Sequence, residues 1–214
     1  MTEQTYICEE CGKEFERDDI SLVKSRIRFC DSECADKAYN SYIEREKKEE
    51  EKKRIESLLK DMPKKVREIE TDISFQGLLE RGCYIVGPVG TGKTILMGSI
   101  AKHFVSKGSA IRWISYPEFV IDIKRKFSGN QDPYRKAEYI SKVRCPVFID
   151  DIGVEKQSDF VKELTYFIIN SRESEELKTY FTSNIPLNKL EDRIASRILS
   201  MCRVVKLDGK DRRI

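Results

Sequence analysis

The sequence contains no apolar run that approaches the ~20 residues needed for a membrane-spanning helix. Its first ten residues, MTEQTYICEE, have neither the basic start nor the apolar stretch of a secretory signal. We therefore expect a cytoplasmic protein that does not associate with membranes and whose thiols stay reduced. The seven cysteines should accordingly not be interpreted as disulfides by default.

An excess of charge of one sign is also missing. Lys and Arg number 40 against 37 Asp and Glu, so the formal net charge is +3. This balance permits nucleic-acid binding without indicating it. There is no internal repeat, and 11 Gly and 6 Pro are spread too thinly for a low-complexity linker. The length allows one ordinary domain with a small appendage.

Charged residues instead concentrate in one stretch. All of residues 44–54, EREKKEEEKKR, are charged, and acidic residues precede basic ones by four positions in the order that supports a helix. This pattern predicts a solvated helical linker that continues through RIESLLK and ends before Pro63. A disordered tether is the alternative. A second polar helix is expected from Lys64 to about Glu80.

From Gly82 onward, short apolar runs alternate with amphipathic stretches. Strands are predicted at residues 83–87, 111–116, 146–151, 178–184 and 202–207. Helices are predicted at residues 93–106, from Pro117, and at 133–142, 158–175 and 187–201. The alternation indicates an α/β fold with a five-stranded parallel sheet and helices on both faces.

A phosphate-binding loop lies between the first of these strands and the helix after it. GPVGTGKT, residues 87–94, satisfies the full P-loop pattern in that position. Glycines let the backbone wrap phosphates, and N–H groups at the helix start point toward them. Lys93 is predicted to reach the β- and γ-phosphates of ATP, and Thr94 to ligate Mg²⁺. The expected nucleotide-binding residues are Gly87, Pro88, Val89, Gly90, Thr91, Gly92, Lys93, Thr94 and Ile95.

Two acids and an amide follow at the ends of later strands. VFIDDIG, residues 147–153, ends a buried strand in Asp150, expected to hold Mg²⁺, and Asp151, expected to orient or deprotonate the attacking water. Asn184, in TSN, is placed to position that water, although Ser-Asn before Ile-Pro is also ordinary turn chemistry.

GPVGTGKT, VFIDDIG, YFTSN and DRIASRI, in this order and spacing, resemble the AAA+ ATPases over about residues 75–214. More narrowly, the sequence resembles the bacterial and phage helicase-loader branch of the DnaC/DnaI type, which also contains the IstB transposition ATPases. Most AAA+ proteins have Glu at the position of Asp151, whose side chain is one methylene shorter. The resemblance implies a P-loop AAA+ core without a helical lid.

The resemblance also implies roles for arginines near the end of the sequence. Arg197 matches the family's arginine finger, which reaches into a neighbouring subunit's site, and Arg193 is the alternative finger. The simpler interpretation of Arg197 is an arginine that faces solvent on an amphipathic helix. A finger acting in trans implies self-association in the ATP state. Arg212 resembles the second sensor arginine of the branch.

Four cysteines near the N-terminus form two closely spaced pairs. Cys8 and Cys11 are separated by two residues, and Cys30 and Cys34 by three. In a reduced compartment this spacing predicts a structural, four-cysteine Zn²⁺ site. The segment resembles a treble-clef finger, and about 40 residues bury too little core to fold without the metal.

These features predict three parts: a zinc-finger module at 1–43, a charged helical linker at 44–74 and an AAA+ ATPase domain at 75–214. By resemblance, the protein is expected to bind the replicative hexameric helicase and load it onto single-stranded DNA, with slow ATP hydrolysis. The alternatives are an IstB-type transposition ATPase that acts on duplex DNA with a transposase, and a zinc-dependent scaffold whose ATPase is a slow switch.

Overall fold

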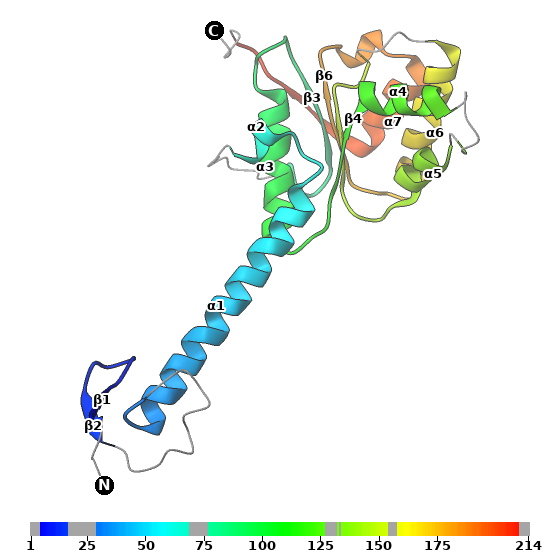
Figure 1. The fold of residues 1–214 in the computed structure, drawn as a ribbon. Helices are drawn as coiled ribbons and strands as arrows, with labels where there is room; N and C mark the ends of the chain where they lie inside the picture. The colour runs from blue at the N-terminus through cyan, green and yellow to red at the C-terminus, as the bar shows by residue number, and fades with distance from the viewer. Residues whose placement is uncertain are drawn as a thin grey trace. The chain divides into compact units, whose positions relative to one another are not determined.

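The computed structural model describes residues 5–16, 29–68, 77–126, 132, 134–153 and 158–209. The chain forms two compact units, Met1–Arg54 and Ile55–Ile214 (Figure 1). The predicted three-part division at 43/44 and 74/75 stays a prediction. Among the described residues, no helix combines the length and the apolar character that crossing a membrane requires.

The first unit contains a small hairpin and the start of a long helix. Strands β1 (Thr5–Ile7) and β2 (Glu14–Glu16) pair antiparallel, and the rings of Tyr6 and Phe15 lie 5.8 Å apart. Helix α1 (Ser32–Leu59) begins after Asp31, whose Oδ1 accepts a hydrogen bond of 2.7 Å from the backbone N–H of Cys34. This side chain caps one of the amide groups left unpaired at the helix start.

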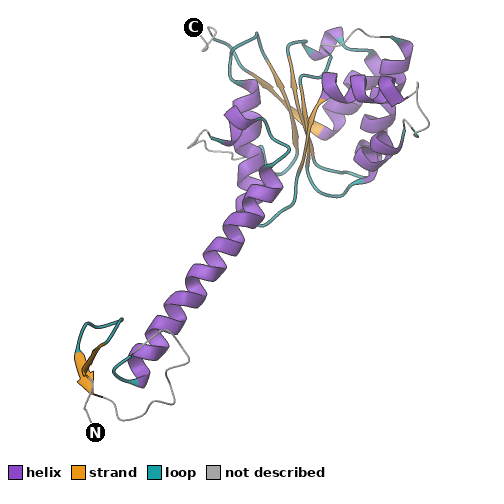
Figure 2. Cartoon of the chain, in the orientation of Figure 1, coloured by secondary structure: helices purple, strands orange, loops and turns teal. Residues whose placement is uncertain are grey.

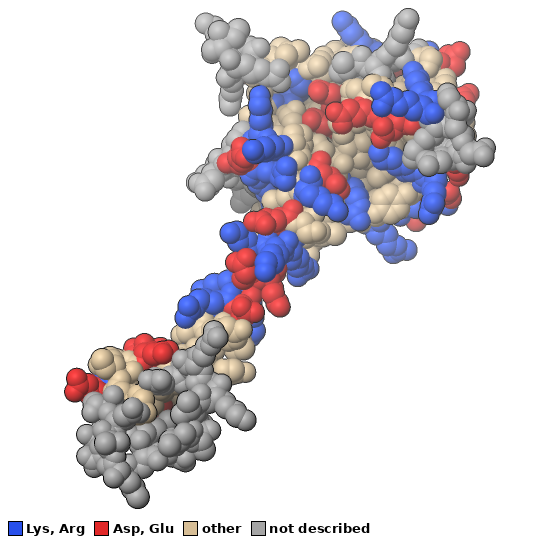
Figure 3. All heavy atoms as spheres, in the orientation of Figure 1, with Lys and Arg blue, Asp and Glu red and all other residues tan. Residues whose placement is uncertain are grey.

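The charged stretch at 44–54 lies inside α1, so its helical interpretation is confirmed. Lys53 Nζ lies 3.9 Å from Glu49, and Arg54 Nη1 lies 3.8 Å from Glu51. Basic and acidic side chains alternate along this helix in Figure 3. Each such exposed pair contributes only about 0.2–0.5 kcal/mol, so the helix is supported here by many weak contacts.

The polar helix predicted from Lys64 to about Glu80 is wrong in its length. Helix α2 spans Lys64–Arg67 only, and residues 77–81 form turns. Residues 69–76 lie outside the described part of the chain. Val66 of α2 is buried against the second unit's core, so tertiary packing rather than helix propensity decides this segment.

The second unit contains the predicted five-stranded parallel sheet (Figure 2). Its strands are β3 (Gly82–Val86), β4 (Arg112–Ser115), β5 (Val147–Asp150), β6 (Thr179–Ser183) and β7 (Cys202–Lys206). The order across the sheet is β4-β5-β6-β3-β7, and every adjacent pair is parallel. Every residue of β3, β5 and β6 is buried, which explains their nearly continuous apolar sequences.

Helices cover both faces of this sheet, as Figure 1 shows. On one face lies α3 (Lys93–Ser106) with α2, over an aromatic stack in which Phe148 lies 6.0 Å from Trp113 and 4.7 Å from Tyr180. On the other face lie α4 (Tyr116–Lys126), α5 (Arg135–Lys142), α6 (Asp159–Ser174) and α7 (Asp192–Met201). The helix predicted at 187–201 is divided, because Leu190 and Glu191 are extended between the 3-10 helix η2 (Leu187–Lys189) and α7.

A fully buried arginine joins α6 to the adjoining loops and strand. Arg172 donates to Thr179 Oγ1 at 2.8 Å and to four backbone carbonyls at 2.8–3.4 Å. The carbonyls belong to Ile140, Val143, Cys145 and Lys178. Burial lowers the pKa of Arg172 to about 10, so the guanidinium stays charged at neutral pH. All five acceptors are neutral, so its charge is balanced here by dipoles.

Gly98 lets α2 approach α3 closely. A Cβ at this position would lie 1.9 Å from Val66 Cγ1 and 3.4 Å from Met62 Cε. We expect Gly98→Ala to destabilise the second unit by about 1 kcal/mol, because a cost of ~1–3 kcal/mol for overpacking exceeds a gain of ~1 kcal/mol in helix propensity.

Urea unfolding followed by the fluorescence of Trp113, the single tryptophan, would measure the effect of Gly98→Ala. The matched comparison places Gly98→Ala in a Val66→Ala background, which removes the clashing carbon. There the alanine should be neutral or stabilising. An equal loss of stability in both backgrounds would mean that α2 does not set the requirement for glycine.

Candidate nucleotide site and candidate metal centre

The P-loop connects the end of β3 to the first residue of α3. Gly90 and Gly92 have φ angles of 81° and 90°, in the left-handed region that favours glycine. A Cβ on Gly87 would lie 2.2 Å from the carbonyl oxygen of Leu207, which follows β7. The glycines therefore serve both the turn of the loop and its close approach to a neighbouring strand.

The loop is closed by its own side chains. Lys93 is only 6 % exposed, and its Nζ donates to the carbonyl oxygen of Pro88 at 2.7 Å. The hydroxyl of Thr91 donates to the same oxygen at 2.9 Å. Because the lysine is the first residue of α3, its ammonium group and the helix N-terminus together make this end of the sheet attractive to anions.

Asp150, the last residue of β5, is buried beside the loop. Its Oδ1 accepts hydrogen bonds from Thr94 Oγ1 at 3.0 Å and from Thr182 Oγ1 at 2.5 Å. Burial raises the pKa of Asp150 to about 6, and the nearby charge of Asp151 acts in the same direction. The two threonine hydroxyls and Lys93 oppose this shift.

Thr182 contributes to this arrangement although the sequence reasoning did not single it out. Its hydroxyl oxygen also accepts a bond of 2.8 Å from the backbone N–H of Asp151. Asp151 has a φ angle of +58°, uncommon for a residue with a side chain. In the sequence, Thr182 stands in the YFTSN stretch, near the end of the buried strand beside the one that carries the acids.

Eight of the predicted site residues line one cleft at the carboxyl ends of the strands. A further pair of bonds shapes the turn that holds Asn184: Ser183 Oγ donates to Ile152 O at 2.7 Å and accepts from Ile185 N at 3.0 Å. The residues that line the cleft are Val89, Gly90, Gly92, Lys93, Thr94, Ile95, Asp151 and Asn184.

The two finger candidates lie on α7, and neither lines the cleft of its own chain. Arg197 donates from Nη1 to Glu173 Oε2 at 3.0 Å and from Nη2 to the hydroxyl of Tyr166 at 2.9 Å. The guanidinium carbon of Arg193 lies 4.5 Å from the centre of the Tyr166 ring. Arg212 lies outside the described residues.

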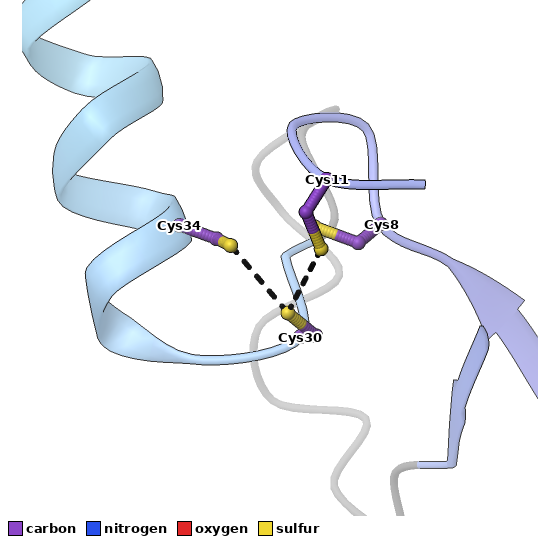
Figure 4. A group of neighbouring side chains, drawn as sticks. All are labelled: Cys8, Cys11, Cys30 and Cys34. Atoms are coloured by element: carbon purple, nitrogen blue, oxygen red, sulfur yellow. Dashed lines mark hydrogen bonds between the residues drawn. The ribbon is translucent and has the colours of Figure 1, made fainter. Parts of the chain in front are cut away.

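The four cysteines of the first unit converge, as Figure 4 shows. Cys8 and Cys11 lie in the turn that follows β1, Cys30 precedes α1, and Cys34 lies in the first turn of α1. All four sulfurs are within 4.8 Å of one another, and Cys30 Sγ lies 3.5 Å from both Cys11 Sγ and Cys34 Sγ. Four thiolates around Zn²⁺ at ~2.3 Å lie ~3.8 Å apart, so these residues fit that ion.

Backbone amides favour the thiolate of Cys8, whereas burial raises the pKa of the Cys30 thiol and a hydrogen bond with Cys30 raises the pKa of Cys34. Burial raises the pKa of the Cys8 thiol, but hydrogen bonds from the backbone N–H groups of Cys11, Cys30 and Glu10 outweigh it and lower the pKa to about 6. Gly12, with a φ angle of +72°, allows its N–H to donate to Cys8 O at 2.9 Å. The turn therefore directs both sulfurs and amides toward one point.

A P-loop between a strand and a helix, with acids at the end of a nearby strand of a parallel sheet, defines a nucleotide-binding domain of the AAA+ type. The sequence profile of the family described as "IstB-like ATP binding protein" matches residues 41–214. The chain belongs to this family.

Two curated relatives are similar to this chain. The replicative helicase loader DnaI of Bacillus subtilis (strain 168) is 28% identical over 150 residues, covering 62% of this chain and 48% of the relative. The replicative helicase loader DnaC of Buchnera aphidicola subsp. Baizongia pistaciae is 26% identical over 120 residues, covering 55% and 48%. The chain thus spans about half the length of these curated relatives.

Two crystal structures share the fold. That of DnaI superposes with a TM-score of 0.59 at 22% identity, covering 69% of this chain and 95% of that one. That of the DnaC helicase loader gives a TM-score of 0.54 at 20% identity, covering 67% and 84%.

Proposed function

We propose that the protein is an ATP-dependent helicase loader, which binds the replicative hexameric helicase and places it on single-stranded DNA. The observation that carries the proposal is the cleft that joins the P-loop to Asp151 and Asn184, in a chain similar to two named helicase loaders. The match to the IstB-like family supports ATP binding in particular.

Within this proposal, the P-loop residues 87–95 hold the phosphates of ATP through backbone N–H groups, and Lys93 neutralises the β- and γ-phosphates. Asp151 orients or deprotonates the attacking water, and Asn184 positions it. Both side chains line the cleft, which supports these roles. Arg212 is proposed as a second contact to the nucleotide, from its position in the sequence alone.

Thr94 and Asp150 would hold Mg²⁺. Two neighbouring ligands of an octahedral Mg²⁺ at ~2.1 Å lie ~3.0 Å apart, and Thr94 Oγ1 and Asp150 Oδ1 are 3.0 Å apart. Both are hard oxygen donors of the kind that this ion prefers. When bound, the ion would neutralise charge that develops on the phosphates.

Arg197 is proposed as the finger that acts on a neighbouring subunit's nucleotide, so the ATP state should self-associate. Its absence from the cleft of its own chain supports an action in trans. Arg193 is the alternative, on the same helix. Hydrolysis is then expected to be slow in a dilute, isolated chain.

The four cysteines are proposed to bind one structural Zn²⁺. Four thiolates would fill the coordination shell of the ion and leave no open position for catalysis. The resulting module would be an arm for contact with a partner, either the helicase or DNA.

Chelation of the metal should unfold the first unit and leave the second unit folded. We expect a strong chelator to unfold the first unit, because its short strands and single helix start bury little apolar surface without the metal. Trp113 lies in the second unit, so its fluorescence should stay unchanged. Metal analysis should give one Zn²⁺ per chain and less than a tenth of that for Cys34→Ser. Loss of the Trp113 signal on chelation would contradict two independently folded units.

The loader proposal is tested against the transposition alternative by size-exclusion chromatography. The full chain is mixed with the replicative hexameric helicase of its host, or with duplex DNA, each with and without ATP and Mg²⁺. Co-elution with the helicase supports a loader. ATP-dependent binding to duplex DNA, with no helicase complex, would support the IstB-type function instead.

A further inference from the structure

Arg197, the proposed finger, is held by contacts within its own chain. Its two terminal nitrogens donate hydrogen bonds to Glu173 Oε2 at 3.0 Å and to the hydroxyl of Tyr166 at 2.9 Å. The guanidinium carbon also lies 5.1 Å from the centre of the Tyr166 ring. An arginine that binds a phosphate in a forked, bidentate manner needs these same nitrogens.

The acceptor is itself fixed in place. Glu173 Oε1 accepts a bond of 2.5 Å from Ser200 Oγ, so each carboxylate oxygen has a partner on α7. The side chains of Arg197 and Glu173 are only 30 % and 24 % exposed. An adjacent, partly desolvated carboxylate offsets much of the positive potential that a finger would apply to a phosphate.

We propose that Glu173, with Tyr166, is a latch that restrains Arg197 until a neighbouring subunit's nucleotide replaces the carboxylate as its partner. This inference rests on the proposed function of Arg197. It assigns Glu173 a regulatory role in hydrolysis, although Glu173 lines no part of the nucleotide cleft among the described residues. The carboxylate of Glu173 and the phosphate compete for the same guanidinium. Releasing Arg197 from the carboxylate should therefore raise the rate of ATP hydrolysis rather than lower it.

Mixed full-length chains separate the finger from the site that it serves. Lys93→Ala supplies a finger without a working nucleotide site, and Arg197→Ala supplies a site without a finger. Each variant alone should hydrolyse ATP at background rate, and their mixture should recover hydrolysis. No recovery would refute the finger itself, and with it the latch.

Glu173→Gln is then introduced into the mixture that recovers hydrolysis, in one experiment on the Lys93→Ala chain and in another on the Arg197→Ala chain. On the Lys93→Ala chain it should raise hydrolysis about two- to fivefold, the range expected for release from a partly exposed ion pair. On the Arg197→Ala chain it should have no effect, which is the matched control. Tyr166→Phe on the Lys93→Ala chain keeps the ring and should give a smaller rise.

Three results would overturn the latch while leaving the finger intact. The first is an unchanged rate of ATP hydrolysis with Glu173→Gln on the Lys93→Ala chain, and the second is a reduced rate. The third is an equal change in rate whether Glu173→Gln is on the Lys93→Ala chain or on the Arg197→Ala chain. A reduced rate would mean that Glu173 positions the finger for action. Thermal unfolding of each variant shows whether the α6–α7 contact survives, and a variant that melts early is replaced by Tyr166→Phe for the same comparison.

Discussion

Lys93→Ala is expected to weaken ATP binding about 100-fold, since hydrogen bonds to a charged group contribute up to ~3 kcal/mol and each ~1.4 kcal/mol is tenfold in affinity. The side chain lies in the cleft at the start of α3, where no other lysine lines the site among the described residues. Its removal leaves the backbone N–H groups of the loop in place, so a weak residual affinity should remain.

Titration with a fluorescent ATP analogue in the presence of Mg²⁺ measures this change. Lys107→Ala is the control, because it removes the same charge from the exposed end of the same helix. It should leave the affinity within twofold of the parent protein. Equal affinities for all three proteins would show that nucleotide binds elsewhere, or that the loop does not contact phosphate through Lys93.

Arg172→Met is expected to destabilise the second unit by about 3–5 kcal/mol, which corresponds to a fall in Tm of about 10 °C. The fully buried guanidinium serves five acceptors, four of them backbone carbonyls that have few alternatives inside the protein. Methionine fills much of the volume but donates no hydrogen bond, so the loss reflects unsatisfied acceptors rather than a cavity.

Chemical unfolding monitored at Trp113 reports the stability of this unit. The matched control is Lys162→Met on the same helix, whose side chain is 37 % exposed. Its effect should stay within about 0.5 kcal/mol. Arg172→Lys should lie between the two, because an ammonium group can serve only some of the acceptors. A loss below about 1 kcal/mol for Arg172→Met would mean that water or a backbone shift satisfies the carbonyls.

Much of the fold could be predicted because the three central strands of its sheet are buried on both faces. β3, β5 and β6 give short apolar runs, and the P-loop fixes one strand–helix junction without ambiguity. The extent of α2 could not be predicted in this way. The segment after Pro63 is polar and suits a helix, but Val66 packs beside Gly98, a contact that depends on tertiary structure.

The candidate site shows the same division. P-loop and cysteine spacings are local in sequence, so they indicated which residues would gather. Thr182 and Glu173 act through partners 32 and 24 positions away in the chain. Glu173 belongs to no motif, and Thr182 stands in the YFTSN stretch, where only Asn184 was assigned a role. Such partners follow from strand register and from the packing of α6 on α7, which single-sequence reasoning does not give. The roles of Asp151, Asn184 and Arg197 stay predictions.

The most direct test of the central claim is helicase loading onto a closed circle of single-stranded DNA. The full chain, ATP, Mg²⁺ and the hexameric helicase of the same host are mixed with the circle, and helicase retained on it after a salt wash is counted. The proposed function predicts retention that requires both the chain and ATP and that is lost with Lys93→Ala. Retention equal to that of helicase alone, together with ATP-dependent binding of the chain to duplex DNA, would contradict it.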